Sequence, residues 1–243
     1  MVVPALDAAL ADIDTVFNGC TSPGERACGV CHLPEEAAYL RTPYTRVPTD
    51  VLRRYTFEVS DHFDDQAAAM RRLLPQGARA LVAGEMEPLG LGFHGLAVVD
   101  WRSWPAEQST PVEAFLLAWW RDVLTMPQPP YRIVEIFELC ASVLRSVIPL
   151  LDRWHPNPGA DAQLAQCVDW WLEKLLVDDS PFGWFLHGEA AAVPELRSWL
   201  SRHAPDRLRG QDQPHLAIRA ELLGLTYDER WSHPYWADAP ATN

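Results

Sequence analysis

Apolar residues recur three or four positions apart along most of the chain, whereas the alternating runs typical of β-strands are nearly absent. Two stretches, residues 133–151 and 160–179, show the helical spacing most clearly. Their apolar positions are Ile133, Ile136, Cys140, Val143, Val147 and Leu151 in the first and Leu164, Val168, Trp171 and Leu175 in the second. Because this spacing lines the side chains along one face, each stretch is predicted to form one helix, of about five turns in the first case. The pattern predicts an all-α fold of antiparallel helix pairs in a HEAT-like helical array.

Prolines and glycines divide the predicted helices. Prolines at positions 156, 158 and 181 follow the two stretches, and a proline after a periodic apolar run is typical of a helix end. Residues 85–105 contain three glycines, each of which weakens a helix, so we predict a loop or a broken helix there. We expect a single all-helical domain over residues 1–243, subdivided into a cysteine-containing part over 1–100 and a tryptophan-rich part over 101–243.

Two Trp pairs suggest an internal similarity. "AFLLAWWRDVLTM" and "AQCVDWWLEKLLV" each place a Trp pair before an amphipathic run, and Trp119 and Trp170 are 51 positions apart. That offset is close to the period of HEAT-like repeats. Large aromatic side chains are also routine in helical cores, and this second interpretation is the one we favour.

The chain is acidic, with 33 Asp and Glu against 20 Lys and Arg and a net charge of −13. Proteins that bind the phosphate backbone need clustered Lys and Arg, so a nucleic-acid partner is not expected. An acidic surface can attract a basic one. We therefore expect another protein with a basic surface as the partner, and the sequence leaves the oligomeric state open.

No membrane span or export signal is predicted. The most apolar stretch is interrupted by Glu135, Glu138 and Arg145, and charges at that spacing are not typical of a span. The first 17 residues carry three aspartates and no basic residue, which favours an amphipathic helix over a secretory signal. We expect a cytoplasmic protein that does not bind a membrane.

Three of the five cysteines lie in "CTSPGERACGVCH", residues 20–32. Cys28, Cys31 and His32 match the C-x-x-C-H spacing that attaches c-type haem. That attachment takes place outside the cytoplasm, so haem c is not expected here. A thioredoxin-like redox pair would need a βαβ unit, and none is predicted.

A structural zinc ion is the functional interpretation that fits this segment best. Cys28 and Cys31 form a C-x-x-C knuckle, and thiolates at such spacings can share one tetrahedral ion with Cys20. His32 is adjacent to Cys31, an awkward place for a second ligand, and His62 or a water could complete the shell. The predicted metal ligands are Cys20, Cys28, Cys31, His32 and His62. The alternative is a set of partly buried thiols that bind no metal, which is also common for cysteine.

The other two cysteines are predicted to be structural, and the sequence lacks common catalytic motifs. Cys140 and Cys167 fall on apolar helix faces and are predicted to be core. The sequence contains no H-E-x-x-H, no G-x-S-x-G and no phosphate-binding loop. We therefore predict a non-enzymatic interaction protein, such as an adaptor, regulator or immunity-type inhibitor, that uses an acidic helical surface. The alternative is a metal-dependent enzyme or sensor with an open site at the cysteines.

Three stretches within about residues 15 to 125 resemble a group of uncharacterised bacterial proteins. They are "CGVCHLPEEAAYLRTPYTRVPTDVLRRYTFEV", "MRRLLPQGARALVAGE" and "WRSWPAEQSTPVEAFLLAWWRDVL". In that group a C-x-x-C-like element precedes a "TP" turn, an "LP" inside a helix and a Trp-rich helix. The resemblance implies an all-helical protein of unknown function and transfers no catalytic residue. This chain departs from the group at "SDHFDDQAAAMRRLLP", which lacks the expected Gly and aromatic pattern.

Overall fold

The computed structural model describes residues 4–26, 28, 30, 32–57, 62–86, 94–183 and 187–238. These residues form helices and connections and contain no strand, so the predicted all-α class is confirmed. The elements are α1 (Pro4–Val16), α2 (Ala37–Arg41), α3 (Thr49–Phe57), α4 (Gln66–Val82), α5 (His94–Val98), the 3-10 turn η1 (Trp101–Ser103), α6 (Ala106–Val123), α7 (Ile133–Leu144), α8 (Ile148–Leu151), α9 (Pro158–Leu176), α10 (Glu189–His203), α11 (Pro205–Arg209), α12 (Pro214–Leu222), α13 (Tyr227–Trp231) and α14 (Tyr235–Asp238).

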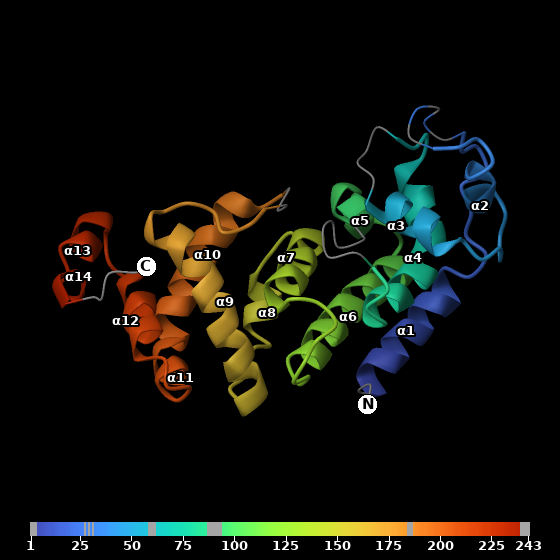
Figure 1. Ribbon diagram of the computed structural model, residues 1–243. Helices are drawn as coiled ribbons and strands as arrows, with labels where there is room; N and C mark the ends of the chain where they lie inside the picture. Colours follow the sequence, from blue (N-terminus) through green and yellow to red (C-terminus); the bar gives the residue numbers. More distant parts are fainter. Residues whose placement is uncertain are drawn as a thin grey trace.

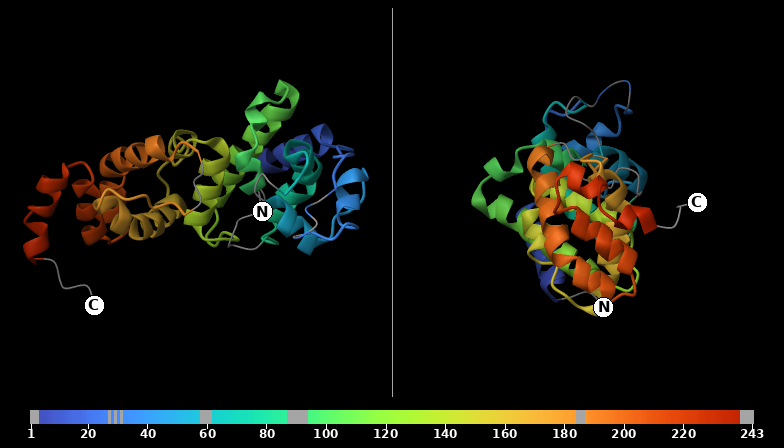
Figure 2. Two further views of the ribbon diagram at one scale, coloured as in Figure 1. Left: turned by 90° about the horizontal axis from the view of Figure 1, so that it is seen from above. Right: turned by 90° about the vertical axis from the view of Figure 1, so that its left-hand side faces the viewer.

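The helices follow one another along an elongated array, with α1 to α4 at one end and α13 and α14 at the other (Figure 1). Viewed from that second end, the helices overlap in a compact bundle (Figure 2). Helix α7 lies between the two halves, because it contacts α5 and α6 on one side and α9 on the other. One cluster of buried apolar residues extends from Leu6 in α1 to Leu223 after α12. A HEAT-like repeat within this array stays a prediction.

None of the described helices has the length and apolar character needed to cross a bilayer.

The predicted helix over residues 133–151 is interrupted and forms α7 and α8. Arg145 ends α7 in a left-handed conformation with φ of 51°. Its guanidinium donates a hydrogen bond to the Val99 carbonyl at 3.1 Å and lies 3.8 Å from the Asp100 carboxylate. These contacts tie the break to the segment that follows α5. All six predicted apolar positions are buried, so the spacing identified the correct face but not the interruption.

Helix α9 confirms the second predicted helix almost to its ends. The Asn157 side chain accepts a hydrogen bond from the Ala160 amide at 3.0 Å, and Pro158 occupies the first helical position. Both features are typical of a helix start.

Prolines end fewer helices than the sequence predicts. Pro75, Pro111 and Pro194 lie inside α4, α6 and α10. The glycine-containing segment forms the short helix α5 and the turn η1 over its described residues 94–105, in agreement with a broken helix. The prediction for its other two glycines falls outside the described residues.

An aromatic core joins the two halves around α7. The Phe137 ring centre lies 5.5 Å from that of Trp120 on α6 and 4.9 Å from that of Trp171 on α9. Trp154 packs edge-on against Trp120 at 5.2 Å. The Trp120 indole donates a hydrogen bond to the Leu150 carbonyl at 3.0 Å, which satisfies its buried N–H. Helix α7 is therefore held in place on both sides.

Candidate functional site

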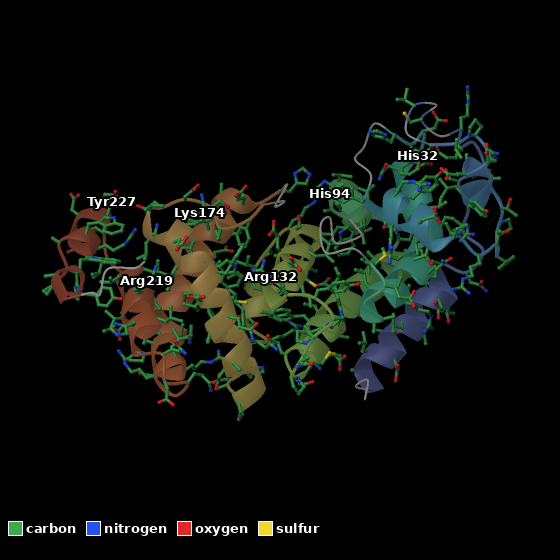
Figure 3. All side chains as sticks on the ribbon, viewed as in Figure 1. His32, His94, Arg132, Lys174, Arg219 and Tyr227 are labelled. Carbon is green, nitrogen blue, oxygen red and sulfur yellow. The ribbon has the colours of Figure 1, made fainter. Side chains whose placement is uncertain are left out.

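The predicted metal ligands lie at the N-terminal end of the array, where Figure 3 labels His32. His32 is buried and packs edge-on against Tyr55, with ring centres 4.6 Å apart. The ring centres of His32 and His62 lie 6.1 Å apart. The backbone amide of His32 donates to the Cys28 carbonyl at 3.1 Å. The structure thus brings His32 and His62 close together, with Cys28 one turn before His32.

Cys20 has a different environment. It is half-buried beside α4, where burial raises the pKa of its thiol and the nearby charges of Arg71 and Arg72 partly oppose that shift. Cys31 lies outside the described residues. Among the residues that are described, no group of three or more Cys, His, Asp or Glu side chains is placed to hold a metal ion. The zinc site therefore stays a prediction.

The two remaining cysteines are core residues, as predicted. Cys140 on α7 and Cys167 on α9 are completely buried. Burial raises the pKa of both thiols, which disfavours the thiolate that metals and electrophiles require.

A cleft between α7 and α9 has the features of a binding site. Helix α7 is buried almost all round, and Glu135 and Glu138 are its half-buried residues. Because they are three positions apart, both carboxylates lie on the same face of the helix. That face also carries Leu139 and Ser142, and it lines a cavity of about 560 Å³.

The opposite wall of the cleft comes from the last turns of α9. Trp170, Glu173 and Lys174 are exposed there and share one helix face by their spacing. Trp170 has 55% of its surface exposed, an unusually high fraction for tryptophan. Lys174 forms an ion pair with Asp179 at 3.0 Å, so its charge is already balanced at the rim. Figure 3 labels Arg132 near the middle of the array and Lys174 farther toward the end that carries Tyr227.

Residues from three other segments close the sides of this cavity, which we call the central cleft. They are Phe57 at the end of α3, His94 and Ala97 on α5, and Ser180, Pro181, Phe182 and Gly183 after α9. His94 packs near Phe57, with ring centres 5.5 Å apart, and burial lowers its pKa. The central cleft is therefore walled by aromatic rings, and its histidine is neutral near pH 7.

Glu135 has the most unusual environment among the carboxylates of the central cleft. Its Oε2 atom is buried and has no hydrogen-bond partner among the described residues. Burial raises the pKa of Glu135, while the charge and backbone amide of Arg132 lower it. A buried carboxylate oxygen without a hydrogen-bond partner carries a desolvation cost.

The charge of the lining is negative. Glu135, Glu138 and Glu173 face the cavity, against Arg132 and the ion-paired Lys174. Aromatic faces and carboxylates are the groups that recognise an ammonium or guanidinium ion. The central cleft is therefore suited to a cation on an apolar stem.

The sequence analysis did not identify this site. Glu135 and Glu138 were noted as interruptions of an apolar stretch, and Trp170 was interpreted as core. The available signal was the pair of carboxylates, three positions apart, within an otherwise apolar helix. Residues 94, 135, 170 and 182 are brought together by tertiary packing, which helical spacing does not predict.

Comparisons of the chain with protein-family models, with curated proteins and with solved structures found no match.

Proposed function

We propose that the protein is a non-enzymatic interaction protein that holds a basic side chain of a partner protein in the central cleft. The observation that carries this proposal is the lining of the central cleft, in which aromatic rings lie beside the carboxylate-bearing face of α7 formed by Glu135 and Glu138. The net charge of −13 supports it, since a negative field attracts a basic partner and raises the association rate.

The chemistry of lysine and arginine matches the central cleft. Their aliphatic stems can pack on apolar walls while the charged end reaches a carboxylate. Trp170 and Phe182 would contact the stem, and Glu135 would receive the charge. A cation over a tryptophan face contributes about 0.5–1 kcal/mol at an exposed site.

The test is calorimetric titration with a set of short arginine-containing peptides, each paired with a peptide in which citrulline replaces the arginine. Citrulline keeps the shape of the side chain and removes its charge. We expect the arginine peptides to bind and Glu135→Gln to weaken that binding about tenfold. Glu107→Gln is the control, because Glu107 is exposed on α6 and does not line the central cleft. Failure of every arginine peptide to bind would overturn the proposal, as would equal binding of the citrulline peptides.

We also propose a structural zinc clip at the N-terminal end, with ligands drawn from Cys20, Cys28, Cys31, His32 and His62. The proximity of His32 and His62 supports this, because two imidazoles at this separation can reach one ion. Elemental analysis of protein purified without added metal should find about one zinc per chain. Absence of metal, together with freely reactive thiols, would contradict the clip. An exchangeable water on the ion would instead favour the alternative of a metal-dependent enzyme or sensor.

A further inference from the structure

Arg132 already occupies part of the central cleft. Its guanidinium carbon lies 4.0 Å from the centre of the Trp170 ring, in a cation–π contact that joins the start of α7 to α9. Arg132 is an exposed residue, and its guanidinium stacks on the Trp170 ring. Stacking on Trp170 is a contact that positions this side chain.

The position of Arg132 is the one that an incoming cation would need. Trp170 offers the exposed aromatic face of the central cleft. Arg132 lies three positions before Glu135, and its charge acts on the Glu135 carboxylate. A partner's basic side chain cannot use the face of Trp170 that Arg132 covers until Arg132 moves away.

Resting on the proposed function, we infer that Arg132 is an internal competitor for the partner's cation. In the free protein it stacks on one face of the Trp170 ring and competes for that face. In the complex the partner's arginine replaces it over the ring and pairs with Glu135. Such competition lowers the apparent affinity in proportion to the fraction of molecules in which Trp170 is open. Arg132 would therefore set a threshold that excludes weakly binding cations.

The inference predicts that removal of Arg132 strengthens binding. An exposed cation–π contact accounts for about a two- to fivefold change in an equilibrium constant, so Arg132→Gln should bind the arginine peptides about that much more tightly. Arg132→Lys should fall between the wild type and Arg132→Gln, because lysine keeps the charge but stacks less well on tryptophan. The variants should fold normally, since the side chain is exposed.

Loss of one positive charge also strengthens attraction for a basic peptide at long range, so the experiment needs a charge-matched control. Arg121→Gln serves, because Arg121 is exposed on α6 and does not line the central cleft. The wild type and the three variants are titrated with the same arginine peptides at about 150 mM salt. At that ionic strength the Debye length is about 8 Å, so long-range attraction is largely screened. Fluorine NMR of 5-fluorotryptophan protein, with the Trp170 signal assigned by Trp170→Phe, reports whether the ring is contacted.

Tighter binding by Arg132→Gln than by Arg121→Gln, with a shift of the Trp170 signal, would support the competitor role. If the wild type binds and Arg132→Gln binds no more tightly than Arg121→Gln, the competitor role is wrong and the proposed function is left intact. If neither protein binds any arginine peptide, both the competitor role and the proposed function are wrong.

Discussion

The two Trp pairs occupy similar positions in α6 and α9 but differ in their surroundings. Trp119 and Trp120 are completely buried, whereas in the second pair Trp171 is buried and Trp170 is 55% exposed. The second members of both pairs pack against Phe137 in the same aromatic core. The two pairs differ in the exposure of their first members, because Trp119 lies in the core and Trp170 lines the central cleft.

This difference shows that the helix facing a tryptophan decides its role. Helix α6 packs against both α1 and α7, so both of its tryptophans are covered. The end of α9 faces the one side of α7 that carries half-buried carboxylates, and a cavity separates them. The same local motif therefore forms core in one helix and a candidate recognition surface in the other.

The largest expected effect separates the two pairs by stability. Trp120→Ala should lower the free energy of unfolding by about 3–5 kcal/mol, because it removes a buried ring and its bond to the Leu150 carbonyl. Trp170→Ala should change it by about 0.5 kcal/mol or less, as expected for an exposed side chain. Urea denaturation measures the free energy of unfolding of both variants. Similar decreases in the two variants would contradict the assignment of Trp120 to the core and Trp170 to the surface.

Filling the central cleft should weaken binding without affecting the core. A Cβ atom added at Gly183 would lie 3.8 Å from Glu138 Oε1, so Gly183→Val directs a branched side chain toward the carboxylates. We expect a loss of peptide affinity of about tenfold and an unchanged unfolding midpoint. Gly24→Val is the matched control, because a Cβ there meets no atom within 4 Å. Unchanged affinity in Gly183→Val would place binding elsewhere.

The left-handed residue at the end of α7 gives a smaller effect on stability. Arg145→Ala and Arg145→Gly both lose the bond to the Val99 carbonyl, but glycine adopts a φ of 51° without strain. Arg145→Ala should therefore be less stable than Arg145→Gly by about 1 kcal/mol. Thermal or urea unfolding of the two variants checks this. Equal stability would show that the helix break is not under conformational strain.

The smallest effect is the pH dependence of Glu135, whose pKa is raised by burial. Its stability contribution is present at low pH and is lost as pH rises from the usual range of glutamate through the raised pKa. Glu135→Gln should therefore gain stability relative to the wild type as pH rises above the usual titration range of glutamate. Arginine-peptide binding should follow the opposite course and weaken as Glu135 takes up its proton. If the free energies of unfolding of the wild type and Glu135→Gln change with pH in the same way, the raised pKa assigned to Glu135 is wrong.

Much of the fold could be predicted from the sequence, and little of the candidate site. The apolar spacing identified α9, the buried face of α7 and α8, and the burial of Cys140 and Cys167. The break at Arg145 was missed because it depends on acceptors from the segment after α5. The central cleft was missed because Glu135 gains its character from burial in the folded chain and from Arg132, which the spacing of residues along α7 does not reveal.

The most direct test of the central claim is hydrogen exchange of the backbone amides with and without a bound arginine peptide. The account predicts that the peptide slows exchange at the start of α7 and in the last turns of α9, with the citrulline peptide and Glu135→Gln giving no such protection. Protection confined to α1–α4, with none at α7 and α9, would contradict it.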